Sequence, residues 1–489
     1  MARTPSTFDR LTRLESELER AEDYTAWRQA AAELDELTDA AAWRDSDEPD
    51  VYDARLLKAE TDELIRRRDA GDALGLVDAV ASTLQRHLGD LAAPELYAVS
   101  LCGTQHTVHR WHDAVEQALL WLLEAPVPDI DDRQKLDRFE QAARLHGRSA
   151  LVLSGGATWG FHHLGVVRCL FENGLLPDIF SGASTGAMIA AGVCTRTDAE
   201  LADMFEDTDQ IRLDGLLPVG LRRAARNRAW LDPAQLEAVL KNNVGVYTFA
   251  EAHARSGRLL NISVAPMRSR QKPRLLSQLT SPDVLVHSAA LASSALPGLF
   301  PPAVLQARTR DGSTAPYLPS ERWADGSLYA DLPKLRLARL YNVNHFIFSQ
   351  TNPHALPVAQ LTARRGVLPT VAGVASAAAR AQGGFAVDML DRITRRRTGP
   401  VRMATERMRA LVGQAYRGDI DIHPRFRLEL IGKMAVNPSR ADLDTFIQEG
   451  RRATWPLLPR IEDQTRIERV LQRCVRTLRA RLGIAGKQL

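Results

Sequence analysis

The chain has 489 residues, of which 45% are hydrophobic and 25% charged, enough apolar material for a large core and more than one domain. Its net charge of +3 gives no chain-wide signature of nucleic-acid binding, so we expect no nucleic-acid partner. The four cysteines, Cys102, Cys169, Cys194 and Cys474, are widely scattered. They predict buried thiols in a reducing compartment rather than a disulfide framework or a zinc site.

The sequence contains no obvious membrane-spanning segment. Its first residues are charged and lack an apolar core, so they do not resemble a secretory signal. The most apolar runs, residues 187–194 and 370–381, are too short or are interrupted by polar residues, whereas a spanning helix needs roughly 18 apolar residues. We therefore expect a cytoplasmic protein whose contact with a membrane is peripheral.

Residues 1–145 are predicted to be almost wholly helical. Apolar residues recur at helical spacing in residues 24–37, 52–71, 74–88 and 108–123. No glycine loop or reactive cluster interrupts them, so this region is interpreted as an accessory domain. A proline-containing linker begins at Pro126.

Residues 148–193 are predicted to form a strand, a glycine loop, a helix, a second strand, a sharp turn and a second helix. The apolar run 150–153 stops at Ser154-Gly155-Gly156, which is typical of a buried parallel strand. A helical stripe follows and ends at Gly174. Backbone N–H groups of the glycine loop could bind an oxyanion.

The second turn carries the sequence GASTG at residues 182–186. A serine between a strand and a helix, flanked by glycines, indicates a nucleophile elbow, because side chains at the glycine positions would collide with neighbouring elements. Ser184 is therefore the predicted nucleophile, with Gly182 and Gly186 as the elbow glycines. The helix beginning after it favours developing negative charge. The alternative interpretation is two tight turns in an ordinary α/β domain.

Ser184 needs a base, and the residues alone leave two candidates open. Asp325 precedes a glycine, as expected of a loop at a strand end, but other Asp-Gly turns occur in the chain. A carboxylate can accept the serine proton directly. A Ser–His–Asp triad in the order Ser184, Asp325 and then His345 or His354 is the competing arrangement.

The remaining histidines and acidic residues carry weaker signals. His162 and His163 follow the glycine loop on the predicted helix, where packing or polar roles are more common than catalysis. His345 falls inside a predicted strand, where a buried structural histidine is the common case. No cluster of His, Asp or Glu has metal-ligand spacing, so we expect no metal and no cofactor.

Three motifs together resemble those of patatin-like phospholipases and lipases. The segment SGGATWGFHHLGV is similar to their glycine-rich oxyanion loop, GASTG to their G-x-S-x-G, and WADGS to their D-G-[GA] segment. The resemblance implies a Ser–Asp dyad of Ser184 and Asp325, with an oxyanion hole formed by Gly155, Gly156 and Ala157. It also implies that the proline-rich turn at residues 297–302 lines an acyl pocket.

The chain departs from the family pattern at two positions. Ala157 replaces the usual third loop glycine, and Ser327 follows the Asp-Gly pair. Ala157 keeps its N–H group, so the oxyanion hole is preserved if the backbone there suits a residue with a Cβ atom. Ser327 is small and polar, and we expect it to be tolerated.

The resemblance extends along nearly the whole chain. Residues 27–57 and 89–115 are similar to the N-terminal extension of intracellular triacylglycerol lipases of fungi and plants. Residues 342–354, NVNHFIFSQTNPH, are similar to the segment that follows the catalytic aspartate in those lipases.

The expected fold is α/β, with a patatin-like core whose mainly parallel sheet is flanked by helices. We expect a helical accessory domain at residues 1–145, a catalytic domain at 146–355, and a helical region at 356–489 that packs on the core. The expected function is hydrolysis of long-chain acyl esters of glycerolipids, either triacylglycerol or phospholipid, through an acyl-enzyme. The alternatives are a lysophospholipid acyltransferase that uses the same acyl-enzyme and a catalytically silent lipid-binding protein.

Two basic segments are candidates for contact with a membrane or lipid-droplet surface. They are residues 222–228 and 395–409. Beside the first, Leu213, Leu216, Leu217 and Val219 could insert among lipids. The alternative for such charge runs is a solvated helix face.

Overall fold

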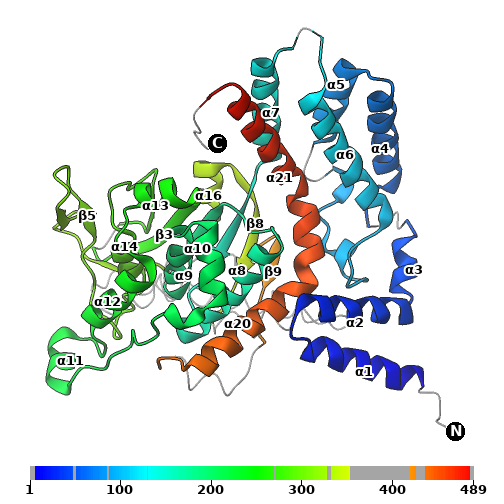
Figure 1. The fold of residues 1–489 in the computed structure, drawn as a ribbon. Helices are drawn as coiled ribbons and strands as arrows, with labels where there is room; N and C mark the ends of the chain where they lie inside the picture. Colours follow the sequence, from blue (N-terminus) through cyan, green and yellow to red (C-terminus); the bar gives the residue numbers. More distant parts are fainter. Residues whose placement is uncertain are drawn as a thin grey trace, which may run out of the picture. The chain divides into compact units, whose positions relative to one another are not determined.

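The computed structural model describes residues 6–47, 51–84, 88–128, 130–268, 271–327, 332–352, 418–425 and 436–484. The chain divides into two compact units. The first comprises Met1–Ser149, Leu337–His345 and Thr454–Leu489, and the second Ala150–Arg336 and Phe346–Ala453 (Figure 1).

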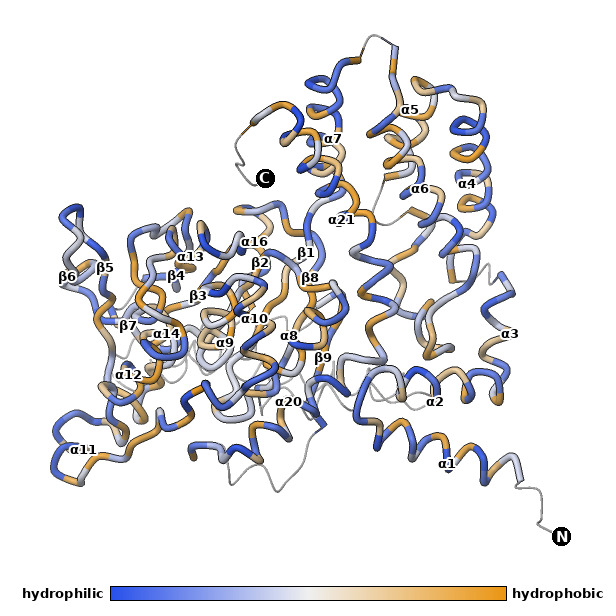
Figure 2. Tube along the Cα trace, in the orientation of Figure 1, coloured by the Kyte–Doolittle hydropathy of each residue, from blue (hydrophilic) through white to orange (hydrophobic). Residues whose placement is uncertain are grey.

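The first unit is helical, as predicted for the N-terminal region. Four of its helices begin behind aspartate caps, since the side chains of Asp23, Asp53, Asp72 and Asp131 each accept a backbone N–H of the following turn. Figure 2 shows the alternation of hydrophobic and hydrophilic residues along these helices. The helices are α1 (Thr7–Arg20), α2 (Tyr24–Leu37), α3 (Ala40–Arg44), α4 (Ala54–Asp69), α5 (Ala73–Thr83), α6 (His106–Glu124), α7 (Asp132–His146) and α21 (Leu458–Arg481).

The core of this unit forms where α21 packs against α6 and α7. Trp111, Val115 and Leu119 recur at helical spacing on α6 and are buried, as are Leu471 and Leu478 on α21. Residues near the C-terminus of the chain thus complete the core of a unit that begins near its N-terminus. Short 3-10 turns connect the helices at η1 (Leu88–Asp90), η2 (Pro94–Tyr97) and η6 (Trp455–Leu457).

The second unit is built on a mainly parallel sheet, which confirms the predicted α/β architecture. The strand order is β4-β3-β2-β1-β8-β9, and β7 also pairs with β3. Pairs β1–β2, β2–β3 and β8–β9 are parallel, whereas β4 and β7 run antiparallel to β3. The strands are β1 (Arg148–Leu153), β2 (Ile179–Gly182), β3 (Leu259–Pro266), β4 (Arg274–Ser277), β7 (Trp323–Asp325), β8 (Val343–Ser349) and β9 (Ile420–Ile422), with a separate hairpin of β5 (Gln306–Arg308) and β6 (Thr314–Pro316).

Strand register brings the two loops identified in the sequence to one edge of the sheet. Leu153, at the end of β1, lies opposite Gly182, at the end of β2. The glycine loop and the GASTG turn therefore leave the sheet side by side, as loops at the carboxyl ends of parallel strands do. The helices of this unit are η3 (Ala157–Phe161), α8 (His162–Glu172), α9 (Thr185–Cys194), α10 (Asp198–Glu206), η4 (Thr208–Gln210), α11 (Leu221–Asn227), α12 (Pro233–Val244), α13 (Phe249–Ser256), α14 (Val286–Ser293) and α20 (Arg440–Thr454), and α16 (Lys334–Tyr341) spans the division between the units.

The cysteines agree with the prediction of buried thiols at three of four positions. Cys169, Cys194 and Cys474 are buried, whereas Cys102 is half-buried, and none forms a disulfide. Burial raises the pKa of the Cys194 thiol to about 12, so it is not a reactive thiolate at neutral pH.

Helix α20 crosses α8 with backbone against backbone. A Cβ atom added at Gly165 would collide with the carbonyl oxygen of Ile447 and lie 2.9 Å from the Cα of Gly450. A Cβ atom at Gly450 would collide in turn with the carbonyl oxygen of His162. Only glycine fits on both sides of this crossing.

We expect Gly165→Ala to destabilise the protein by about 2 kcal/mol, because overpacking a tight contact typically costs about 1–3 kcal/mol. The matched control is Gly192→Ala in α9, where a Cβ atom would make ordinary contacts of 3.5 Å with Arg196 and 3.7 Å with Asn243. That change should be neutral or stabilising by up to about 1 kcal/mol. Urea denaturation followed by circular dichroism measures both. Equal midpoints for the two variants would contradict the close crossing.

Candidate active site

Ser184 occupies a strained turn between β2 and α9. Its backbone has φ 52° and ψ −125°, a conformation that non-glycine residues rarely adopt. Its N–H group donates to the hydroxyl of Ser293 at 3.0 Å, and that hydroxyl donates to the carbonyl oxygen of Ser263 at 2.8 Å. Ser293 is fully buried. The strained turn is therefore braced from α14 by a residue that sequence analysis did not single out.

The glycines on either side of Ser184 lie where backbones approach closely. A Cβ atom at Gly182 would collide with the carbonyl oxygen of Gly186, and one at Gly186 with that of Leu153. Any side chain at either position would push β1, β2 and the start of α9 apart. The collisions expected from the sequence for side chains at Gly182 and Gly186 thus correspond to specific backbone carbonyl groups.

Asp325 ends β7 and is buried, with 2% of its surface exposed. Its carboxylate accepts the N–H of Ser327 at 2.8 Å. Burial raises the pKa of Asp325 to about 6, and hydrogen bonds from Ser327 and from the side chain of Ser184 act in the opposite direction. The Ser184 side chain thus lies close enough to the Asp325 carboxylate to stabilise its ionised form, although the two residues are far apart in the sequence.

Ser327, the departure after the Asp-Gly pair, contacts the site directly. Both its N–H and its hydroxyl stabilise the ionised form of Asp325. Its Cβ atom lies 3.1 Å from where a Cβ atom of Gly155 would be, and that of Ser184 lies 3.3 Å from the same point. The structure thus brings the glycine loop, the nucleophile and the acidic residue together around Ser327.

The glycine loop follows β1 and includes one unfavourable backbone angle. Ala157 has φ 49°, in the left-handed region that favours glycine, which costs an alanine roughly 1–2 kcal/mol. A Cβ atom at Gly156 would collide with the hydroxyl of Thr351. The backbone at Ala157 thus keeps a conformation that favours glycine, although this residue has a Cβ atom.

A buried polar network fixes the direction of this loop. The hydroxyls of Ser154 and Thr351 donate to the carbonyl oxygen of Gly155 at 2.9 and 3.1 Å. Across a trans peptide the C=O and the next N–H point in opposite directions. Anchoring the Gly155 carbonyl in the interior therefore aims the N–H of Gly156 the other way, away from the network.

His163 belongs to this network and is a structural residue. Its Nε2 lies 2.9 Å from the carbonyl oxygen of Ser154, which can only accept, so Nε2 carries the proton. Its Nδ1 then accepts the hydroxyl of Ser349 at 2.7 Å. Burial lowers the pKa of His163 to about 4, which keeps the ring neutral. The adjacent His162 is also buried, and its pKa is well below the ordinary value.

His345 has partners other than the site residues. Its Nδ1 lies 3.0 Å from the Ser149 hydroxyl and its Nε2 lies 2.9 Å from Oε1 of Gln464. Both ring nitrogens are thus engaged within the first unit. His354 and residues 395–409 lie outside the described residues.

An apolar pocket opens beside Ser184. Its empty space, part of which is open to solvent, amounts to about 1190 Å³. Its walls are mostly leucine, isoleucine, valine, methionine and phenylalanine from α8, α9 and α12. Leu299 and Phe300, in the proline-rich turn, also line it. The pocket offers an extended apolar ligand a place next to the serine hydroxyl.

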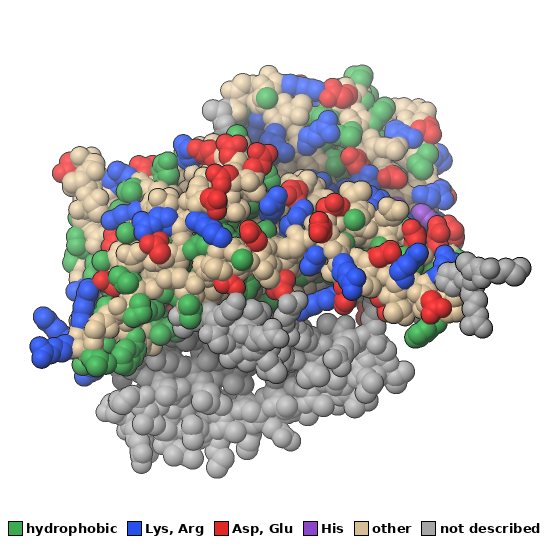
Figure 3. Space-filling model, turned by 60° about the horizontal axis from the view of Figure 1, so that its bottom comes forward, with side chains coloured by type: hydrophobic (Ala, Val, Ile, Leu, Met, Phe, Trp, Pro, Cys, Tyr) green, Lys and Arg blue, Asp and Glu red, His purple; other side chains and the backbone are tan. Residues whose placement is uncertain are grey.

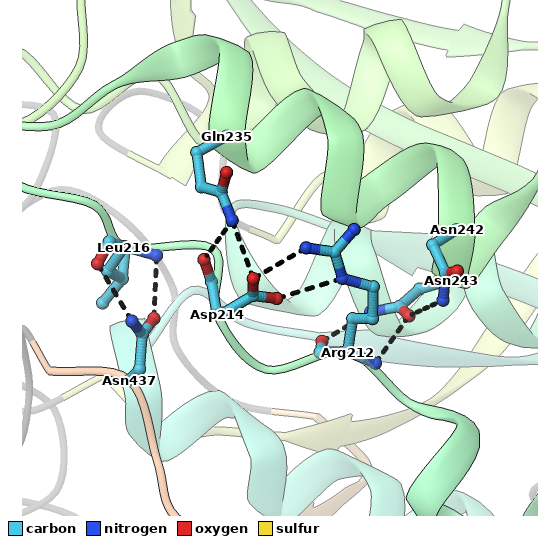
Figure 4. Close-up of polar contacts among 7 residues, drawn as sticks. All are labelled: Arg212, Asp214, Leu216, Gln235, Asn242, Asn243 and Asn437. Carbon is cyan, nitrogen blue, oxygen red and sulfur yellow. Dashed lines mark hydrogen bonds and ion pairs between the residues drawn. The ribbon is translucent and has the colours of Figure 1, made fainter.

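Residues 211–217, which we call the strap, form another wall of this pocket. Figure 4 shows the side chains that form hydrogen bonds with it. Asn243 accepts the N–H and donates to the carbonyl of Arg212, both at 2.9 Å, and Asn437 does the same for Leu216 at 2.7 and 2.9 Å. Between them, Gln235 donates to the carboxylate and the carbonyl of Asp214.

Within the described part of the chain, no group of three or more His, Cys, Asp or Glu side chains is arranged to hold a metal ion. None of the helices described combines the length and the apolar character needed to cross a bilayer.

Comparisons with known proteins agree with the motifs. Residues 151–336 match the family model of patatin-like phospholipases, and residues 5–144 match a domain of unknown function, DUF3336. A solved structure, that of VipD from Legionella pneumophila, aligns with 64% of this chain and 67% of its own at 15% identity, with a TM-score of 0.32.

Several curated relatives align with almost the entire chain. Triacylglycerol lipase SDP1L of Arabidopsis thaliana is 32% identical over 96% of this chain and 61% of its own, and triacylglycerol lipase 4 of Saccharomyces cerevisiae is 31% identical over 96% and 54%. The chain thus spans little more than half the length of these two relatives. Triacylglycerol lipase ptl3 of Schizosaccharomyces pombe is 30% identical over 92% of this chain and 95% of its own. Together with the family model across the elbow and Asp325, these alignments show that the chain belongs to the patatin-like phospholipase family, in the group that includes plant and fungal triacylglycerol lipases.

Proposed function

We propose that this protein is a serine acyl hydrolase that cleaves long-chain acyl esters of glycerolipids through a dyad of Ser184 and Asp325. The observation that carries the proposal is the position of the elbow serine, whose side chain lowers the pKa of the buried Asp325 carboxyl and which itself lines an apolar pocket. The names of the plant and fungal relatives support triacylglycerol or a related glycerolipid as the substrate.

The chemistry follows from the roles of these two side chains. Asp325 accepts the proton of Ser184 as its oxygen attacks the ester carbonyl. The N–H groups of Gly155, Gly156 and Ala157 stabilise the resulting oxyanion. The ester C–O bond then breaks, the proton passes to the leaving alcohol, and water releases the fatty acid by the same route in reverse.

The raised pKa of Asp325 suits a general base. At about 6, the carboxyl is mostly ionised at neutral pH yet more basic than an exposed aspartate. Burial disfavours the ionised form, whereas Ser327 and the side chain of Ser184 favour it. No histidine is required by this arrangement.

The surface around α11 supports contact with a lipid interface. Arg222, Arg223, Arg226 and Arg228 are exposed, and Leu217, Leu221 and Trp230 are exposed by 48%, 76% and 57%. Figure 3 shows basic and hydrophobic side chains together at this edge. We call these seven residues the α11 surface. Leu213 and Leu216, which the sequence suggested as insertion residues, line the pocket instead.

We expect Ser184→Ala to abolish ester hydrolysis and Asp325→Asn to lower kcat by about 10³ or more, since each removes one member of a unit that acts together. Hydrolysis of a p-nitrophenyl acyl ester measures both. A fluorophosphonate probe should label the wild type but not Ser184→Ala. Ser256→Ala, whose hydroxyl bonds only to the backbone of Ala252 and Arg258, is the matched control and should behave as wild type.

A collapse of activity in His345→Ala or His354→Ala, with the circular dichroism spectrum unchanged, would contradict the dyad. Near wild-type turnover by Ser184→Ala would reject the nucleophile itself.

We expect kcat/KM to rise with pH through an inflection near 6 and to level off above it, because Asp325 must be ionised to accept the serine proton and its pKa is raised to about 6. Ser327→Ala removes a hydroxyl that lowers this pKa, so its inflection should move to higher pH. Rates from pH 4.5 to 8 on a short-chain ester provide the test. A profile that is flat down to pH 5 would be inconsistent with Asp325 as the base.

We expect the protein to bind anionic vesicles at low salt and to release them at high salt. Each arginine near an anionic surface contributes about 1 kcal/mol, so Arg222→Glu combined with Arg226→Glu should weaken co-sedimentation by tenfold or more. The control reverses Arg28 and Arg310, which are exposed outside the α11 surface. Vesicle binding that ignores both salt and the α11 substitutions would exclude this docking site.

A further inference from the structure

One side of α9 lines the pocket from the nucleophile onward. Thr185, Met188 and Gly192 contribute to the wall and follow one another at steps of three or four residues, so they lie along the same side of the helix axis. Arg196, just after the end of α9, also lines the pocket. The pocket therefore extends away from Ser184 in the direction of α9.

The facing wall has the same periodicity. Leu236, Val239, Leu240 and Asn243 line the pocket from α12, again at helical steps, and α12 contacts α9. The strap lies over this wall, because a Cβ atom at Gly215 would be 3.0 Å from Cδ1 of Leu236. Helices α9 and α12 and the strap thus line three sides of the part of the pocket that we call the channel.

The far end of the channel is closed by a charged side chain. Nη1 of Arg196 donates to the carbonyl oxygens of Gly192 and Asn243, each at 2.7 Å. This guanidinium joins the C-terminal ends of α9 and α12, where helices leave carbonyls without intrahelical partners. An acyl chain that pushed it aside would leave these partly buried groups unsatisfied, which is costly.

Gly192 lies just before this closed end. A Cβ atom there would be 3.5 Å from Arg196 and 3.7 Å from the Asn243 carbonyl, which is ordinary contact. A larger side chain, however, would extend into the channel. Gly192 is thus the position on α9 where the absence of a side chain keeps the last part of the channel open.

The helical rise converts these positions into lengths. At 1.5 Å per residue, Met188 and Gly192 lie about 6 and 12 Å beyond Ser184. Arg196 follows the end of α9, and its Nη1 lies 2.7 Å from the Gly192 carbonyl oxygen, so the closed end lies about 15 Å beyond Ser184. A fully extended chain of single bonds advances about 1.2 Å per bond, since a residue of three bonds spans about 3.3–3.6 Å. Met188, Gly192 and the closed end therefore correspond to about 5, 10 and 12–13 bonds of an acyl chain attached at Ser184.

We propose that this channel measures the acyl chain, with Arg196 as its end and Gly192 as the residue that admits chains longer than about ten carbons. The proposal rests on the proposed function and specifies its substrate class, namely esters of fatty acids of up to about fourteen carbons. Each methylene that enters the channel contributes roughly fourfold to binding, and methylenes beyond Arg196 contribute nothing.

The experiment compares kcat/KM for p-nitrophenyl esters from C4 to C18 in wild type, Gly192→Leu and Met188→Trp. We expect the wild-type values to rise up to about C12–C14 and then stop rising. In Gly192→Leu the ratio of C14 to C4 should fall at least tenfold and the break should move to about C8–C10. In Met188→Trp the break should come earlier still, near C4–C6.

The matched control is Ala441→Leu, which adds the same kind of bulk at an exposed position of α20 and should keep the wild-type ratio. A second measurement needs no variant. Alkyl fluorophosphonates of increasing chain length should react with wild-type Ser184 at rates that rise up to about C12–C14 and no further.

Two outcomes would overturn the proposed limit on acyl-chain length while leaving the proposed function intact. One is an equal ratio of C14 to C4 in all variants. The other is an earlier break in Gly192→Leu than in Met188→Trp, which would mean that the acyl chain runs in another direction. Reactivity with phosphonates that keeps rising through C18 would also overturn it. If the wild-type protein neither hydrolyses any ester nor reacts with the phosphonates, both the limit on acyl-chain length and the proposed function are wrong.

Discussion

The geometry at Ser184 depends on backbone segments that approach one another too closely for side chains. A Cβ atom at Gly182, Gly186 or Gly326 would collide with a carbonyl oxygen of a neighbouring segment. The ends of β1, β2, β3 and β7 and the start of α9 therefore converge on one point. Because Ser184 and Asp325 are short side chains on these segments, backbone packing rather than flexible side chains sets their separation.

This convergence has a cost in stability, and the surrounding structure offsets it. Ser184 and Ala157 both adopt positive φ angles, and Asp325 is a carboxyl buried among apolar groups. Backbone strain and a buried charge persist only where the surrounding contacts allow no other arrangement. Ser293 supplies such a contact under the nucleophile and His163 under the glycine loop, and neither touches a reacting atom.

The sequence by itself determined those features that depend on near neighbours in the chain. Apolar residues at helical spacing predicted the helices of the first unit, and short apolar runs predicted β1 and β2. The Gly-x-Ser-x-Gly pattern indicated the elbow because its steric requirement lies within five residues. The family resemblance added Asp325, which the residues alone left beside other Asp-Gly pairs. Burial distinguishes Asp325 from the aspartates of the other Asp-Gly pairs, since Asp325 is buried while Asp214 and Asp311 are exposed.

Only the tertiary structure decided which distant residues meet. Ser293, Thr351 and Asn437 carry no local signal, yet they brace the nucleophile, the glycine loop and the strap. Leu213 and Leu216 looked like membrane contacts because they precede basic residues, but the clasped strap directs them to the pocket. Hydropathy records that a side chain avoids water, whereas packing alone decides whether it meets a lipid surface, a substrate or the core.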